Sequence, residues 1–236
     1  MIEIKNLTKK FRNFVAVNNV SLTINSGECF ALLGLNGAGK TTLINMLTTQ
    51  TKPTSGSAII DGFDLIKQAE EIKKIINISP QESAVAKNLT VKENLQLVCD
   101  LYNIKNSGEQ VNNLICQFGL EQKQNEICKK LSGGQLRRLS IALAMITNPK
   151  ILFLDEPTLG LDVKARKHLW DIIDKLKLQT TIVLTTHYLE EVEHLADKIA
   201  IISAGTIKAV GSPNQIVATA NAKNLEDAFI NLSEEE

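Results

Sequence analysis

Two glycine-rich segments, far apart in the chain, contain the residue types that hold phosphate groups. The first, GLNGAGKT at 34–41, matches the pattern G-x-x-x-x-G-K-[ST], with an apolar stretch before it and a helical pattern after it. Its glycines let backbone N–H groups turn towards a phosphate, while Lys40 can reach the β- and γ-oxygens and the Thr41 hydroxyl can ligate Mg²⁺. A chance glycine turn would rarely have both correct flanks, so we expect a nucleoside triphosphate site. The residues expected to bind the nucleotide are Gly34, Leu35, Asn36, Gly37, Ala38, Gly39, Lys40, Thr41 and Thr42.

An Asp–Glu pair follows an apolar stretch later in the chain. The segment ILFLDEP at 151–157 is typical of a buried strand that delivers Asp155 and Glu156 to its carboxyl end, where ligands bind in open α/β sheets. Asp155 is the expected Mg²⁺ ligand and Glu156 the expected general base for water, since nucleotide hydrolysis needs both functions. Alone, Asp-Glu-Pro could equally be a polar strand exit into a turn. Beside a phosphate loop we favour the catalytic interpretation.

The second glycine-rich segment, LSGGQ at 131–135, has no lysine placed to hold a nucleotide of its own. Ser132 stands where a helix cap belongs, and Gly133 and Gly134 leave their N–H groups unshielded at the positive end of the helix dipole. Such a helix end binds anions, including a γ-phosphate. The simpler alternative is a plain capped helix whose glycines allow close packing.

Strands and helices alternate around these segments as an α/β protein requires. Apolar runs predict strands at 2–4, 20–24, 29–33, 57–62, 75–79, 151–154 and 181–186, and a hairpin formed by KIAIIS and TIKAVG. Apolar residues at helical spacing predict helices at 40–49, at 163–178 and in YLEEVEHLA. From about 88 to 146 strand signals disappear, and this helical block ends in a helix that begins near Ser132. We expect an α/β fold with a mostly parallel core sheet, an N-terminal antiparallel β region and an inserted helical subdomain.

Composition disfavours several classes of protein. Lys+Arg and Asp+Glu both number 26, so no basic excess points to nucleic acid as the partner. The N-terminus lacks the apolar core of a signal peptide, and no apolar run approaches the ~20 residues that span a bilayer. We therefore expect no transmembrane segment. The four cysteines, Cys29, Cys99, Cys116 and Cys128, never form a CxxC spacing and are expected to be free buried thiols in a reducing compartment.

Taken together, the motifs resemble those of the ATP-binding cassette (ABC) ATPases. GLNGAGKT, LSGGQ, ILFLDEPTLGLD and the TTH triplet occur in the family's order, and the resemblance covers about residues 1–218. It implies a P-loop NTPase fold of the ABC type in one domain, 1–236. The implied parts are a RecA-like core with its β subdomain at 1–87 and 147–218, a helical signature subdomain at 88–146, and a short helix with an acidic tail at 219–236.

In ABC ATPases two cassettes enclose two ATP molecules head to tail, and each signature loop completes the site of the facing subunit. By this resemblance Ser132, Gly133, Gly134 and Gln135 act on the γ-phosphate held by another chain, either a second copy or a homologous ATPase. The resemblance also implies ATP and Mg²⁺ as cofactors. The implied metal ligands are Thr41, Gln81 and Asp155.

Five further positions take their roles from the resemblance alone. Phe11 matches the aromatic residue that stacks on adenine, and Phe14, three residues later, could be confused with it. Val17 matches a small apolar position that often touches the base. The other three are Gln81, which reaches Mg²⁺ and the attacking water, Asp162, which contacts the opposite subunit, and His187, which contacts the γ-phosphate and orients water.

Smaller features resemble one branch of the family. Leu35 stands where proline is common and Leu143 where arginine is frequent, and PTLGLD, THYLEE and LEDAFINL (225–232) add to a likeness with the drug- and antibiotic-export branch. This likeness implies an ATPase subunit at the cytoplasmic face of the cell membrane, docked on a separate membrane-spanning subunit of an exporter.

Two other functions remain as alternatives. A soluble ABC ATPase acting on ribosomes or DNA would usually have two cassettes or a long coiled-coil insertion. A non-hydrolytic nucleotide switch is disfavoured by the intact Asp155–Glu156 pair and by His187.

Overall fold

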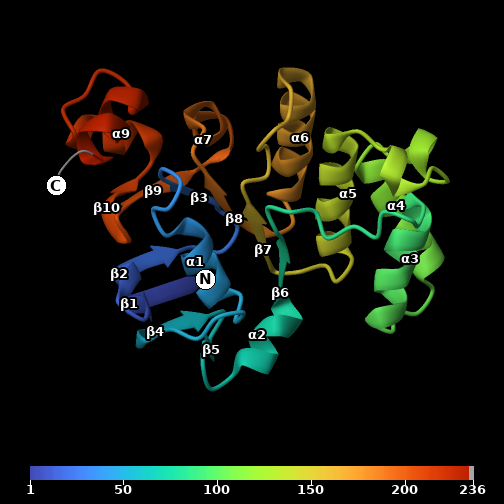
Figure 1. Ribbon diagram of the computed structural model, residues 1–236, viewed down its shortest axis with the longest axis horizontal. Coiled ribbons are helices and arrows are strands. Elements are labelled where there is room, and N and C mark those ends of the chain that lie inside the picture. The colour runs from blue at the N-terminus through green and yellow to red at the C-terminus, as the bar shows by residue number, and fades with distance from the viewer. Residues whose placement is uncertain (234–236) are drawn as a thin grey trace.

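Two β-sheets and the helices around them make up the computed structural model, which describes residues 1–233 (Figure 1). The N-terminal sheet has antiparallel neighbours in the order β2-β1-β4-β5. Its strands are β1 (Ile2–Phe11), β2 (Phe14–Ile24), β4 (Ser55–Ile60) and β5 (Phe63–Asp64). This sheet is the predicted antiparallel β region.

The larger sheet has the order β10-β9-β3-β8-β7-β6 and is almost entirely parallel. Its strands are β3 (Cys29–Leu33), β6 (Ile76–Ser79), β7 (Ile151–Asp155), β8 (Thr181–Thr186), β9 (Lys198–Ser203) and β10 (Thr206–Gly211). Parallel neighbours cannot be joined by tight hairpins, so the chain crosses between them through helices. β10 is antiparallel to β9 and completes the predicted hairpin. The mostly parallel core sheet is confirmed.

The helices fall into groups that Figure 1 separates clearly. They are α1 (Lys40–Leu47), α2 (Ala69–Ile75), α3 (Val91–Leu101), α4 (Ser107–Gln117), α5 (Gly133–Met145), α6 (Val163–Leu176), α7 (Leu189–Leu195), α8 (Pro213–Thr219) and α9 (Leu225–Ser233), with short 3₁₀ turns at Glu121–Lys123 and Cys128–Lys130. α3, α4 and α5 lie together at one end of the molecule and correspond to the predicted helical block. α9 lies at the opposite end, beside β9 and β10.

β3 shows why its sequence has no hydrophobic alternation. Its five residues are all buried, because alternate side chains enter different cores. Ala31 and Leu33 belong to the core shared with the helical block. Phe30 and Leu32 belong to the core shared with the N-terminal sheet and α1. The strand before the phosphate loop is thus held on both faces.

Some elements differ from the sequence expectations. β5 and α2 were not predicted, and the C-terminal region contains α8 as well as the predicted short helix, α9. Residues 234–236, the end of the predicted acidic tail, lie outside the described residues. Within the described chain no helix is both long and apolar enough to span a bilayer.

The four cysteines are free thiols, as expected, but not all of them are buried. Cys29, Cys99 and Cys128 lie in the core, while Cys116 near the end of α4 is exposed. Burial raises the pKa of Cys29 to about 12 and also raises the pKa of Cys99 and Cys128. Those three thiols therefore stay protonated at neutral pH.

Candidate functional site

Four neighbouring parallel strands end at one edge of the large sheet and bring the predicted motifs together. The phosphate loop follows β3, Gln81 follows β6, Asp155 ends β7, and His187 follows β8. The register places Leu33 opposite Thr186, and Asp155 opposite Thr185. Because carboxyl ends of parallel strands meet at one edge, residues from four distant segments converge there.

Glycine is required at the end of the phosphate loop. Gly39 has φ +102°, and a Cβ added there would lie 2.4 Å from the Ala16 carbonyl oxygen of β2. Gly39 is also the N-cap of α1 and has no side chain to bond the first helical N–H groups. The loop and the start of α1 therefore offer backbone donors and a positive helix end to an anion.

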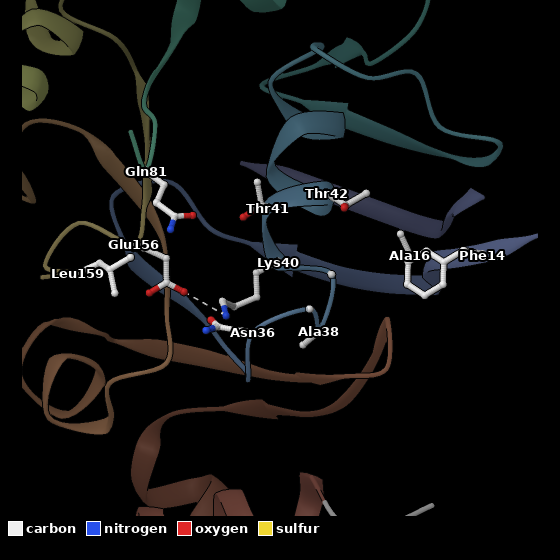
Figure 2. Close-up of a pocket in the computed structure, with 12 residues that line it drawn as sticks. Phe14, Ala16, Asn36, Ala38, Lys40, Thr41, Thr42, Gln81, Glu156 and Leu159 are labelled. Atoms are coloured by element: carbon white, nitrogen blue, oxygen red, sulfur yellow. Dashed lines mark ion pairs between the residues drawn. The ribbon is translucent and has the colours of Figure 1, made fainter. Parts of the chain in front are cut away.

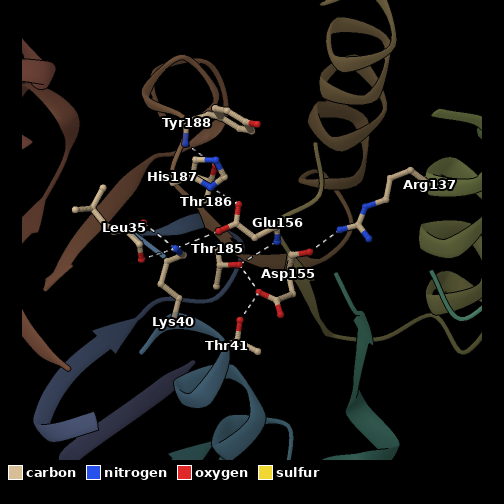
Figure 3. A network of polar contacts seen from close by, with 11 residues as sticks. Leu35, Lys40, Thr41, Arg137, Asp155, Glu156, Thr185, Thr186, His187 and Tyr188 are labelled. Atoms are coloured by element: carbon tan, nitrogen blue, oxygen red, sulfur yellow. Dashed lines mark hydrogen bonds and ion pairs between the residues drawn. The ribbon is translucent and has the colours of Figure 1, made fainter. Parts of the chain in front are cut away.

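The Lys40 ammonium group is buried and has three oxygen partners. It donates to the Gly34 carbonyl at 2.7 Å and to the Leu35 carbonyl at 3.1 Å. It also forms an ion pair with the Glu156 carboxylate at 3.1 Å, and both side chains are about 5% exposed. The loop lysine and the predicted general base are thus in direct contact (Figure 3).

The Asp155 carboxylate faces the phosphate-loop helix. Its Oδ1 accepts from the Thr41 hydroxyl at 3.2 Å and from the Thr185 hydroxyl at 2.5 Å. Thr185 also accepts from the Glu156 backbone N–H through the same hydroxyl oxygen, at 2.9 Å. Thr185 therefore fixes both acidic residues, and sequence reasoning had not singled it out. The available signal was a threonine near the end of a fully buried strand.

Glu156 lies between the phosphate loop and His187. Its Oε2 is 2.8 Å from His187 Nδ1, while Oε1 is the atom paired with Lys40. The Glu156 backbone has φ +48°, a conformation that costs on the order of 1 kcal/mol in a non-glycine residue and is kept only where the surroundings enforce it. This turn aims the carboxylate at Lys40 and His187 instead of continuing the strand direction.

A pocket of about 410 Å³ opens at this edge of the sheet (Figure 2). Its lining is Phe14, Ala16, Asn36, Gly37, Ala38, Gly39, Lys40, Thr41, Thr42, Gln81, Glu156 and Leu159. Figure 2 shows Gln81 and Glu156 on one side, the phosphate loop in the centre, and Phe14 with Ala16 on the far side. The pocket therefore has a carboxylate and an amide at one end, the backbone N–H groups of the phosphate loop in the centre, and an aromatic face at the other end.

Two expected base contacts differ from the observed lining. Val17 is fully buried and packs in the core between the N-terminal sheet and α1, and its strand neighbour Ala16 lines the pocket in its place. Phe11 is not among the lining residues, and its ring lies 4.9 Å from the Lys9 ammonium. Phe14, its cross-strand partner, lines the pocket and is 63% exposed.

The donors beside the phosphate loop suit Mg²⁺. A hydroxyl, a carboxylate and an amide oxygen, from Thr41, Asp155 and Gln81, are hard oxygen ligands of the kind this ion prefers. Within residues 1–233 no group of three His, Cys, Asp or Glu side chains could hold a metal by itself. A site of this kind fits a metal ion that arrives with phosphate oxygens, as Mg²⁺ does in nucleotide complexes.

The second glycine-rich segment begins α5 with a complete capping box. Gln135 N–H donates to the Ser132 hydroxyl at 3.3 Å, and Ser132 N–H donates to the Gln135 side chain at 2.9 Å. None of the residues 131–135, nor Asp162, is among those described as lining this pocket. Asp162 instead caps α6 by accepting from Ala165 N–H at 2.8 Å. The structure thus brings together the phosphate loop, Gln81, the Asp155–Glu156 pair and His187, while these two, like Phe11 and Val17, lie outside the pocket lining.

A phosphate loop between a buried parallel strand and a helix, with an Asp–Glu pair ending a nearby strand, defines a P-loop nucleoside triphosphatase. The family described as "ABC transporter" matches residues 17–159, more than half of the chain. The chain belongs to the ABC transporter family, and it is an ATP-binding ATPase domain of that family.

Solved structures agree along almost the whole chain. The "ATP binding subunit of ABC transporter" has a TM-score of 0.87 at 27% identity, covering 98% of this chain and 99% of that chain. The ATP-binding cassette MJ0796, solved as a dimer in a post-hydrolysis state bound to ADP and Pi, has a TM-score of 0.80 at 30% identity and covers 90% of this chain and 98% of that chain.

Curated relatives are much longer proteins. The human "Phospholipid-transporting ATPase ABCA3" is 41% identical over 217 residues, which is 89% of this chain and 13% of the relative. The Arabidopsis thaliana "ABC transporter A family member 7" is 39% identical over 86% of this chain and 22% of the relative. The chain therefore spans between an eighth and a quarter of these proteins, which belong to the A family; they do not specify a drug-export branch.

Proposed function

We propose that two copies of this chain, or one copy and a homologous ATPase, hydrolyse Mg²⁺-ATP at their shared interface. One observation carries this proposal. The phosphate loop, Asp155, Glu156 and His187 converge at one site, whereas the anion-binding end of α5 does not line the pocket of its own chain. A second chain that faces the first supplies the end of its own α5 to this pocket.

In this mechanism Glu156 takes the proton of the attacking water, while the water oxygen bonds to the γ-phosphorus and ADP leaves. His187 contacts the γ-phosphate and orients the water from beside Glu156. Lys40 leaves its ion pair with Glu156 and turns to the β- and γ-oxygens, which frees the carboxylate for the water. Thr41, Asp155 and Gln81 would hold Mg²⁺, which would neutralise phosphate charge.

The aromatic hairpin supplies the adenine contact. Phe11 and Phe14 pair directly across the β1–β2 hairpin and are both well exposed, at 48% and 63%. Phe11 is the position implied by the family resemblance, and Phe14 is the one that lines the pocket. Single Phe11→Ala and Phe14→Ala variants, compared by equilibrium ATP binding, assign the stacking ring to whichever substitution weakens affinity more. Unchanged affinity in both would refute the hairpin contact.

Mixing two inactive variants tests the shared site. Lys40→Ala removes the lysine of the phosphate loop and leaves the signature segment, LSGGQ at 131–135, intact. Gly133→Ala alters the signature segment and leaves the phosphate loop intact. In a mixed dimer, one interface joins the intact phosphate loop of one chain to the intact signature segment of the other. We expect each variant alone to be nearly inactive and the equimolar mixture to recover a substantial share of the parent's ATPase rate.

The mixing experiment has a matched control. A mixture of Lys40→Ala with a chain altered at both Lys40 and Gly133 contains no complete site and should remain inactive. A Gly133→Ala chain that hydrolyses ATP at the parent's rate by itself would contradict the shared site.

We further propose that this ATPase powers a separate membrane-spanning subunit at the cytoplasmic face of the cell membrane, in the export direction. The human relative is named a phospholipid-transporting ATPase, which supports a membrane substrate. Several apolar side chains on or beside α3 are exposed: Leu97, Leu101 and Tyr102.

Purification of the tagged chain from its native membrane should co-isolate a protein with several membrane spans. Co-isolation of ribosomes or DNA instead would favour the soluble alternative.

A further inference from the structure

Arg137 is a buried cation that the proposed mechanism does not use. It lies on α5, two residues beyond the glycine-rich segment LSGGQ (131–135), and only 5% of it is exposed. Burial lowers its pKa to about 10, so the guanidinium remains charged at neutral pH. A buried charge of this kind is costly unless hydrogen bonds replace its hydration.

The guanidinium replaces that hydration with four backbone carbonyl oxygens from two segments. Nη1 donates to Pro80 at 2.5 Å and to Gln81 at 3.2 Å, in the turn after β6. Nη2 donates to Asp155 at 2.6 Å, and Nε donates to Pro157 at 2.8 Å, on either side of Glu156. Figure 3 shows the side chain reaching from α5 towards the Asp155 backbone.

Two of these carbonyls belong to residues of the proposed site, Gln81 and Asp155, and the other two, of Pro80 and Pro157, belong to the residues directly before Gln81 and after Glu156. Gln81 and Glu156 line the pocket, and the Asp155 side chain bonds to Thr41 of the phosphate-loop helix. The planar guanidinium has donors in a fixed fork, so it sets the distance between the Gln81 segment and the 155–157 segment as well as binding each. A flexible ammonium group with donors at a single point could not do both.

We propose that Arg137 is a positioning residue that couples the signature helix α5 to the catalytic groups of its own chain. A displacement of α5, when its glycine-rich end engages the partner's nucleotide, is transmitted through the guanidinium to the backbone at Gln81 and on both sides of Glu156. The two sites of a dimer thereby sense each other. This inference rests on the proposed dimeric ATPase function.

Arg137→Met tests the coupling by removing the donors while keeping most of the apolar stem. We expect kcat to fall about 10- to 100-fold, because catalytic groups lose their alignment, while KM for ATP stays within about threefold. Arg137→Lys retains the buried charge and should show the same direction of effect if Arg137→Met fails to fold.

The neighbouring arginine provides a matched control. Arg138 donates at 2.8 Å to the Phe118 and Gly119 carbonyls just beyond α4, inside the helical block. Arg138→Met removes an arginine from the same helix and should lower the thermal midpoint while leaving kcat within about twofold. Equal losses of kcat in Arg137→Met and Arg138→Met would reduce Arg137 to a structural role and overturn the inference.

A double-mutant cycle with Gln81→Ala separates positioning from general destabilisation. If Arg137 acts partly through Gln81, the double variant will keep a higher kcat than the product of the two single effects predicts. Independent, multiplicative effects would contradict coupling through Gln81. A parent chain that fails to hydrolyse ATP under any condition would refute the proposed function itself, which is a different outcome from an unaffected Arg137 variant.

Discussion

The buried contact between Lys40 and Glu156 joins two residues that sequence reasoning had assigned to different tasks. Each role followed from a local motif: a lysine at the end of a glycine loop, and an acid at the end of an apolar strand. Their ion pair did not follow, because it depends on a strand register and on the unusual Glu156 backbone conformation. At this scale the motifs predicted residues that do lie together: the phosphate loop, Glu156 and His187 are in contact or share one pocket edge. The sequence did not reveal Thr185 and Arg137, because their contacts with the site are hydrogen bonds in the buried interior.

The ion pair leads to a prediction for Glu156→Gln. Glutamine keeps the shape but removes the charge that competes with phosphate for Lys40, so we expect ATP to bind several-fold more tightly. Loss of the general base should reduce turnover at least about 100-fold. Equilibrium binding of a fluorescent ATP analogue and steady-state phosphate release measure the two effects, and size-exclusion chromatography with ATP should show an accumulated dimer.

Lys40→Ala is the control for the same ion pair. It removes the phosphate contact itself and should lose most nucleotide affinity, so the two partners of one pair move binding in opposite directions. Weaker ATP binding in Glu156→Gln would show that the carboxylate does not compete with the phosphate.

Among the elements, the strongly patterned ones were predicted, whereas β5, α2 and α8 were not. β3 and β7 are apolar runs, β8 is rich in β-branched residues, and α6 has a clear apolar stripe, so their types were evident. α2 has seven residues with a single buried one, Ile72, which leaves little periodicity to detect. α7 is also short, and it contains a feature that its pattern did not reveal, the buried carboxyl of Glu191.

Glu191 should make stability depend on pH. Burial raises its pKa above the ordinary 4.5, and the Trp170 indole donates to its Oε1 at 3.3 Å. The folded chain therefore keeps a proton that the unfolded chain releases, so stability falls as pH rises from about 4.5 through the raised value. The slope is at most about 1.4 kcal/mol per pH unit for one proton.

Urea unfolding of Glu191→Gln between pH 5 and 8 tests this sign. The variant removes the titrating group, so its free energy of unfolding should decline less with pH than that of the parent. Glu190→Gln is the matched control, because that neighbouring side chain is 71% exposed and should leave the parent's slope unchanged. Identical slopes in all three proteins would contradict the assignment.

At the scale of the whole molecule, one chain contains every motif, but its segment 131–135 does not line its own pocket. Motif order alone implied a partner, through the family resemblance, and the structure supplies a physical reason to look for one. Gly133 has helical geometry and nothing within 4 Å of an added Cβ, so the chain's own fold gives no cause for glycine there. A nucleotide held by a partner chain and approaching this helix end would explain the glycine at position 133.

Gly133→Ala should therefore separate stability from activity. Alanine is favoured over glycine in a helix by about 0.5–1 kcal/mol, so the thermal midpoint should stay level or rise. ATPase activity should fall at least about 10-fold, because the Cβ blocks close approach of a phosphate. Gly108→Ala on α4 is the matched control, since it also has open space, and it should keep full activity. An active Gly133→Ala chain would leave that glycine without a role between chains.

The uneven distribution of the cysteines has a practical consequence for observing such motions. Cys116 is exposed on α4 while the other three thiols are buried and protonated, so a maleimide dye added to the unaltered chain will attach at a single place. That place lies on the helical block, at the end of the molecule opposite α9. Fluorescence of a dye attached at Cys116 can thus measure movement of this block during turnover without any substitution in the chain.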